Sequence, residues 1–169
     1  MCSTPNYNFF NNIDKYITEV KKIENPNLPN TPLVDCKSFS NQEDLGNKEK
    51  AESLCNSFAS LNKFLVAIKE EVRDPCNFLN YWLNYELTQP LFSDDNCISY
   101  VYNGMDSHLE SNDAYKSLNC ILYNINKVEL NKMNKLYNLY KNYSKLKTII
   151  DSNWEENKQE ILTLSTQCC

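Results

Sequence analysis

The stretch Pro75-Cys76-Asn77-Phe78-Leu79-Asn80-Tyr81-Trp82-Leu83-Asn84-Tyr85-Glu86-Leu87 decides the fold class of this chain. It is dense in large apolar side chains and ends before Pro90. Asp74 precedes it as a candidate N-cap, and Pro75 stands at the first helical position, where its missing N–H costs nothing. The stretch therefore predicts a helix over about 76–87.

Helical patterns continue from this stretch in both directions, because apolar residues recur every three or four positions. Toward the N-terminus they predict helices over about 7–23 and 47–72, with a proline-rich linker over 25–35. Toward the C-terminus, Ser93-Asp94-Asp95 is a candidate N-cap for a short helix, which Gly104 is expected to end.

The last third of the chain carries a longer apolar stripe. Asn112-Asp113 is predicted to cap a helical pattern over 113–150. This pattern is either one very long helix or two helices with the break near 124–134, where asparagine is dense. Asp151-Ser152-Asn153 then begins a last helix.

Nothing in the chain favours a strand of more than about three residues. We therefore expect an all-α fold, with about five to seven helices joined by long loops. The prediction is a single disulfide-braced helical domain over 1–169, whose core helices lie over about 47–166. Tyrosine and tryptophan at helical spacing are interpreted as core residues rather than as a ligand cage, because each ring buries a large area.

Composition argues against catalysis and nucleic-acid binding. Gly46 and Gly104, the two glycines, lie too far apart for a phosphate-binding loop, and one histidine cannot supply a site of two or three His ligands. This histidine is His108, and we expect it to lie in a solvent-exposed polar turn. Arg73 is the single arginine, and the lysines are scattered among acids in a chain of net charge −5, which is unlike a nucleic-acid reader. We expect no enzyme, cofactor or metal site.

Two further features of the composition bear on structure. The chain has 26 asparagines and uses lysine in place of arginine, which indicates A/T-rich codons. Codon bias therefore accounts for the asparagines, and we do not expect them to form polar ladders. No apolar run reaches the roughly 18 residues that a membrane-spanning helix needs, so the chain as given is expected to be soluble.

Eight cysteines are many for a chain of 169 residues. There is no C-x2-C pair, and five of them lie on or just before different predicted helices, which favours disulfides between helices. Buried free thiols of a cytosolic protein are the alternative. Cys168 and Cys169 are not expected to pair with each other, because adjacent residues meet disulfide geometry only with strain. The pairing stays open among the candidates Cys2, Cys36, Cys55, Cys76, Cys97, Cys120, Cys168 and Cys169.

One pattern within the opening stretch resembles a known family. Cys-x-x-Leu-x-Tyr-Trp-Leu, which follows a predicted helix bearing Cys55, is similar to the Plasmodium interspersed repeat (pir) superfamily and most of all to its vir-type branch. The likeness extends from the first predicted helix to about Cys120 and is loose beyond it. The residues that carry the pattern are Cys76, Leu79, Tyr81, Trp82 and Leu83.

The resemblance implies a variant surface antigen, exported into or onto the infected red cell and acting in immune evasion or adhesion. Host cell-surface receptors and antibodies are the implied partners. Family members carry a transmembrane helix and a cytoplasmic tail after the cysteine-rich ectodomain, and both are absent from this chain, so an ectodomain is expected. The alternative is a non-adhesive structural or remodelling protein inside the host cell.

The resemblance assigns roles to some residues and not to others. The motif residues are expected to be scaffold, with Trp82 and Leu83 in the core and Cys76 holding their helix. No receptor-binding residue can be carried over from the family. Because binding groups concentrate on loops held by a rigid frame, we expect the binding surface on the loops 24–46 and 88–113.

Overall fold

A computed structural model describes residues 6–25, 36–42, 45–72, 74–90, 92, 97–153 and 158–167. Within those ranges the backbone is helical or irregular, apart from an isolated β-bridge between Gly46 and Phe92. The predicted all-α fold is therefore confirmed. In chain order the elements are the 3-10 helix η1 (Asn8–Asn12), α1 (Ile13–Ile23), α2 (Cys36–Gln42), α3 (Lys48–Ile68), α4 (Pro75–Glu86), α5 (Ile98–Leu109), α6 (Lys127–Asn153) and α7 (Lys158–Gln167).

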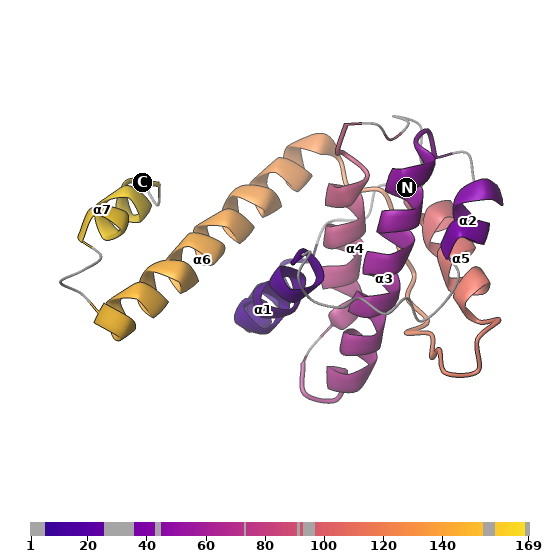
Figure 1. The fold of residues 1–169 in the computed structure, drawn as a ribbon, viewed down its shortest axis with the longest axis horizontal. Helices are drawn as coiled ribbons and strands as arrows, with labels where there is room; N and C mark the ends of the chain where they lie inside the picture. Colours follow the sequence, from indigo (N-terminus) through magenta and orange to yellow (C-terminus); the bar gives the residue numbers. More distant parts are fainter. Residues whose placement is uncertain are drawn as a thin grey trace.

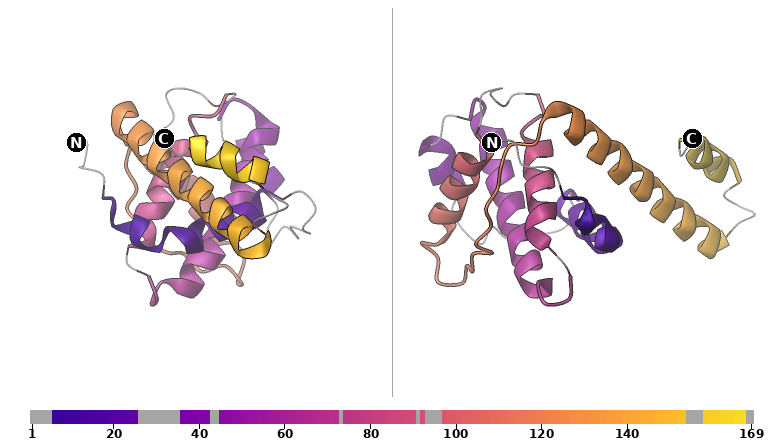
Figure 2. Two further views of the ribbon diagram at one scale, coloured as in Figure 1. Left: turned by 90° about the vertical axis from the view of Figure 1, so that its left-hand side faces the viewer. Right: turned by 180° about the vertical axis from the view of Figure 1, so that it is seen from behind.

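The helix that the opening stretch predicts, α4, lies at the centre of the molecule. Figure 1 shows α3 and α4 side by side, with α2 and α5 on one flank and α1 and α6 on the other. In the view from behind in Figure 2, α6 extends away from this body, and α7 lies near its far end. The motif helix is thus in contact with helices from both halves of the chain.

Aromatic side chains from η1, α1 and α4 form the centre of the core. Phe9, Tyr16 and Phe78 are fully buried, and the rings of Tyr16 and Phe78 stack with their centroids 4.1 Å apart. The ring of Phe9 lies 5.7 Å from that of Phe78 and 5.5 Å from that of Tyr81. Aromatic pairs at such distances stabilise by about 0.5–1.5 kcal/mol beyond the area they bury. The interpretation of these aromatics as core residues agrees with this packing.

Two disulfides link elements of this body. Cys36 at the start of α2 is bonded to Cys55 in α3, with their Cα atoms 5.8 Å apart. Cys76 in the first turn of α4 is bonded to Cys120, which lies 44 residues further along the chain and outside any helix. The first bond fastens the short helix α2, and the second fastens a segment that no helical hydrogen bonds support.

Several predicted signals at helix ends are wrong. Gly104 does not end α5, which continues to Leu109 and places His108 in its last turn, 5.9 Å from the ring of Phe39. His108 is therefore partly buried on a helix and not in a polar turn. The buried face of α5 outweighs the roughly 1 kcal/mol that glycine costs inside a helix. Asp74 stands at the N-cap of α4, but at φ 55° its side chain makes no capping bond.

The largest difference concerns residues 113–126. The sequence predicts helix there, whereas residues 115–126 form an extended, irregular segment, and α6 begins only at Lys127. Further upstream, α3 ends at Ile68 instead of near residue 72. The predicted linker residues 26–35 lie outside the described residues, as do the caps at 93–95.

The side chain of Glu86 has a pKa well above its ordinary value. Glu86 ends α4, and burial together with the nearby carboxylate of Glu24 raises its pKa to about 7, against a smaller lowering by Lys50. Because the folded value lies above the ordinary 4.5, the folded state holds this proton more tightly. The stability that the protonated form contributes is therefore lost as the pH rises from about 4.5 to about 7.

We accordingly predict that Glu86→Gln makes the protein more stable near neutral pH and changes little in acid. The neutral amide keeps the shape of the protonated acid, so the gain should reach about 2–3 kcal/mol above the folded pKa. Denaturant unfolding of both proteins at about pH 5 and about pH 8 measures it. An equal difference at both pH values would contradict the assignment to Glu86.

Candidate functional site

The extended segment 115–126 is the candidate functional site. It presents side chains along the surface, while side chains of the helices under it form hydrogen bonds with its backbone. Its side chains alternate between the two sides: Cys120 and Leu122 are buried, whereas Ile121 between them is 92% exposed. This period of two is that of an extended chain rather than of a helix. The helix that the sequence predicts for these residues is therefore wrong.

Two asparagines of α4 bind the backbone of the segment as a neighbouring strand would. The N–H of Tyr123 donates to Asn80 Oδ1 at 2.9 Å, and the N–H of Ile125 donates to Asn84 Oδ1 at 2.8 Å. Asn84 Nδ2 also donates to the carbonyl of Tyr123 at 3.1 Å. Asn80 and Asn84 are buried and stand one helical turn apart, so their amides face two alternate residues of the extended chain.

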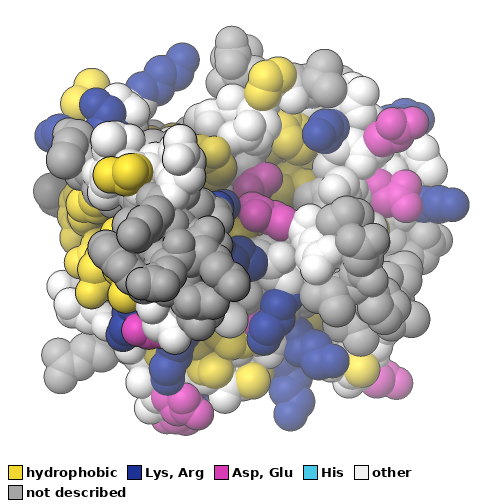
Figure 3. Space-filling model, turned by 60° about the vertical axis from the view of Figure 1, so that its left-hand side comes forward, with side chains coloured by type: hydrophobic (Ala, Val, Ile, Leu, Met, Phe, Trp, Pro, Cys, Tyr) yellow, Lys and Arg dark blue, Asp and Glu magenta, His cyan; other side chains and the backbone are white. Residues whose placement is uncertain are grey.

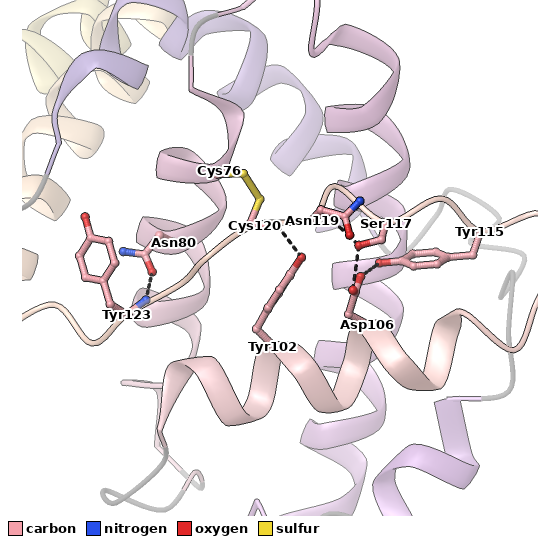
Figure 4. Close-up of a disulfide and its surroundings, with 9 residues drawn as sticks. All are labelled: Cys76, Asn80, Tyr102, Asp106, Tyr115, Ser117, Asn119, Cys120 and Tyr123. Atoms are coloured by element: carbon pink, nitrogen blue, oxygen red, sulfur yellow. Dashed lines mark hydrogen bonds between the residues drawn. A yellow bond between two sulfur atoms is a disulfide. The ribbon is translucent and has the colours of Figure 1, made fainter. Parts of the chain in front are cut away.

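Side chains of α3 and α5 fasten the other half of the segment. The buried Asn62 of α3 donates through Nδ2 to the carbonyl of Lys116 at 2.8 Å. The N–H of Cys120 donates to the hydroxyl oxygen of Tyr102 on α5 at 3.0 Å. Beside this bond lies the Cys76–Cys120 disulfide (Figure 4). Three helices thus supply side-chain partners for one irregular segment.

A carboxylate anchors the start of the segment. Asp106 of α5 accepts hydrogen bonds from the hydroxyl of Tyr115 at 2.5 Å and from that of Ser117 at 2.8 Å (Figure 4). Burial and this carboxylate raise the pKa of the Tyr115 phenol, which therefore stays a donor. Two residues further on, Asn119 has a φ of 56°, a left-handed conformation that asparagine tolerates and that turns Cys120 toward α4.

The asparagines of this site are residues that sequence reasoning missed. The A/T-rich codon bias accounts for the number of asparagines in the chain, but it does not indicate that Asn80 and Asn84 bind backbone groups of the segment. A signal was present in the opening stretch: two amides four residues apart lie among large apolar side chains of one helix. Buried amides in that setting need hydrogen-bond partners, because an unpaired buried polar group costs about 1–3 kcal/mol.

The motif residues lie behind the site rather than on it. Leu79 and Leu83 are fully buried, and Tyr81 and Trp82 are 2% and 5% exposed. They pack α4 into the body, while Cys76 on the same helix carries the disulfide to the segment. Their placement is that of scaffold residues.

The two loops expected to form the binding surface contain helices. The range 24–46 holds α2, and its residues 26–35 lie outside the described chain. The range 88–113 holds α5, whose inner face is buried and whose Tyr100 is 62% exposed. The extended segment, which follows directly after this second range, was predicted as helix and not as binding surface.

The remaining candidate cysteines are placed as follows. Cys97 is the N-cap of α5 and carries an exposed free thiol that is bonded to no described cysteine. The hydroxyl of Ser99, 3.2 Å from this sulfur, and the N–H of Tyr100 lower its pKa. Cys2, Cys168 and Cys169 lie outside the described residues.

We predict that a maleimide labels Cys97 rapidly in the folded protein, while the peptides of the two disulfides are recovered as linked pairs. An exposed thiol with a lowered pKa reacts readily, and disulfide sulfurs do not react. Peptide mapping without reduction, after labelling, measures both. A Cys97 peptide recovered only in a crosslinked form would contradict the assignment.

The described part of the chain holds neither a candidate metal centre nor a candidate membrane span. No group of three or more His, Cys, Asp or Glu side chains there could hold a metal ion. None of the helices in the same residues combines the length and apolar character needed to cross a bilayer.

The fold and the site define a disulfide-braced helical protein that presents an irregular segment along its surface. The family model described as Plasmodium vivax Vir protein matches residues 4–161, and the chain belongs to this family. The predicted membership is thereby confirmed, and the match runs well past Cys120, where a loose likeness was expected. The chain is accordingly a variant antigen of a malaria parasite. No curated protein and no solved structure matches it.

Proposed function

We propose that this domain is displayed by the infected red cell, on its surface or after export into it, and takes part in immune evasion and in adhesion to a host receptor. The extended segment 115–126 would supply part of the surface that receptors and antibodies contact. One observation carries this proposal: helix side chains, rather than the segment's own exposed side chains, hold its backbone.

Such fastening suits a protein whose surface must vary. Hydrogen bonds to backbone N–H and C=O groups are available whatever side chain a residue bears, so exposed positions can change without loss of the bonds. Ile121 is the most exposed large apolar residue in the described part of the chain, so burial does not constrain which side chain stands at this position. The proposal assigns the domain no catalytic role and no nucleic-acid partner.

Binding by the folded chain to an array of host cell-surface proteins, and to antibodies raised against the native domain, tests the proposal. We expect Ile121→Asp to weaken at least one of these interactions about tenfold or more, while stability changes by no more than about 0.5 kcal/mol. Leu162→Asp on α7, where an apolar side chain is 64% exposed, is the matched control. If neither receptor nor antibody binding responds to Ile121→Asp, the segment is not the contact surface. If no host surface protein binds, a non-adhesive role inside the host cell is favoured.

A further inference from the structure

The helix α6 has two apolar faces, and only one of them packs on the body. The inner face contributes Leu130, Met133 and Tyr137, all buried, and it contacts α1 and α4. The helix then continues beyond the body toward α7 (Figure 1). A helix of 27 residues is about 40 Å long, so a large part of its outer surface faces solvent.

The outer face carries a line of exposed apolar side chains. Val128 is 65% exposed, Leu139 42%, Tyr143 57% and Ile150 44%. At about 100° per residue these four positions fall within an arc of roughly 60°, and its centre lies about 140° around the helix from the centre of the buried face formed by Leu130, Met133 and Tyr137. We call these four residues the outer stripe. A line of this kind along a whole helix differs from single exposed apolar residues, which are normal on any surface.

The charge of α6 is opposite to that of the whole chain. The helix holds six lysines and two acids, a net charge of +4, while the chain as a whole carries −5. Lys135 and Lys147 are exposed and lie beside the outer stripe on the helical projection. Glu129, the acid nearest the stripe, is already paired with Lys132 at 2.6 Å. The outer stripe therefore lies in a basic surface.

We propose that the outer stripe of α6 binds an anionic lipid surface. An interfacial helix lays its apolar side chains into the headgroup region while adjacent lysines contact lipid phosphates and carboxylates, and tyrosine is favoured at that depth. Figure 3 shows apolar side chains and lysines, with some acidic side chains among them, exposed on the side from which α6 and α7 project.

The shape and charge of the surface favour lipid over protein partners. A second copy of the chain would bring two basic helices together, and like charges repel. The two hollows described beside α6 lie on its other side: one is lined by Leu130, Asn131 and Asn134, and the other by Asn134, Tyr137 and Lys141. A projecting convex helix with a narrow apolar line matches a flat, negatively charged surface.

Cosedimentation of the full chain with vesicles tests the proposal. We expect binding to vesicles of phosphatidylcholine mixed with phosphatidylserine, little binding to phosphatidylcholine alone, and loss of binding as salt is raised. Lys135→Gln/Lys147→Gln should weaken binding about 30-fold, since each lysine near an anionic surface contributes roughly a fivefold factor. The matched control is Lys21→Gln/Lys63→Gln, which removes the same charge from exposed sites on α1 and α3.

A second pair of variants separates the apolar contribution. Leu139→Ser/Tyr143→Ser should weaken binding by about tenfold or more, and circular dichroism with a thermal melt should show that the fold is kept. Absence of binding to phosphatidylserine vesicles at low salt would overturn the proposal, as would equal losses in the two lysine pairs. Light scattering that shows a dimer, lost in Leu139→Ser/Tyr143→Ser, would instead assign the stripe to a second copy of the chain.

Discussion

Replacing Cys76 and Cys120 together by serine is expected to lower the free energy of unfolding by about 4 kcal/mol. The bond closes a loop of 44 residues, so its removal restores a large conformational freedom to the unfolded chain. It also releases the extended segment 115–126, which has no helical hydrogen bonds of its own. This bond is therefore expected to be the more important of the two.

The matched comparison is Cys36→Ser/Cys55→Ser, which opens a loop of 19 residues and should cost about 3 kcal/mol. Denaturant unfolding of the three proteins gives both values. Amide hydrogen exchange adds a local measurement: protection of the N–H groups of Tyr123 and Ile125 should fall in the first variant and not in the second. An equal loss of protection at these two N–H groups in both double variants would show that the Cys76–Cys120 disulfide does not hold the segment.

Asn84→Ala is the second change from which a large effect is expected, a loss of about 2–4 kcal/mol. The amide of Asn84 is 5% exposed and bonds both the N–H of Ile125 and the carbonyl of Tyr123. Removing it leaves two groups of the segment without partners, at roughly 1–3 kcal/mol each. The higher helix propensity of alanine offsets less than about 1 kcal/mol of this cost.

Two further variants show whether the hydrogen bonds are the cause. Asn131→Ala on α6 is an exposed control and should change stability by less than about 0.5 kcal/mol. Asn84→Asp keeps an acceptor for the N–H of Ile125 but loses the donor and buries a charge, so it should destabilise most at neutral pH and recover in part in acid. If Asn84→Ala matches the exposed control in unfolding measurements, the amide does not fasten the segment.

The helices that sequence analysis predicted well are those with a strong local signal. The helix α4 begins at Pro75 and ends at Glu86, within a residue of the prediction. For the first predicted helix, 7–23, the structure has a 3-10 turn followed by α1. In both, apolar periodicity indicates the limits and the packing agrees with them, and for α4 the proline at its first position indicates the same start.

The predictions that failed rest on signals that packing overrode. Gly104 resembles a helix stop, but α5 continues because Met105 and Leu109 are fully buried beyond it. Residues 113–126 carry apolar residues at helical spacing, and this spacing does not exclude an extended conformation. Whether these residues form a helix or an extended segment depends on hydrogen-bond partners far along the chain. A local sequence pattern holds no information about such partners.

The sequence by itself determined the all-α class, the central helix with its buried motif, and the family. Helical periodicity is a property of neighbouring residues and can be read without knowledge of contacts. Only the tertiary structure decided that 115–126 is extended, because its hydrogen bonds come from Asn62, Asn80 and Asn84, 39 to 54 residues away. The same holds for the partners of Cys36 and Cys76, since pairing depends on distances in space and the spacing of cysteines allows many arrangements.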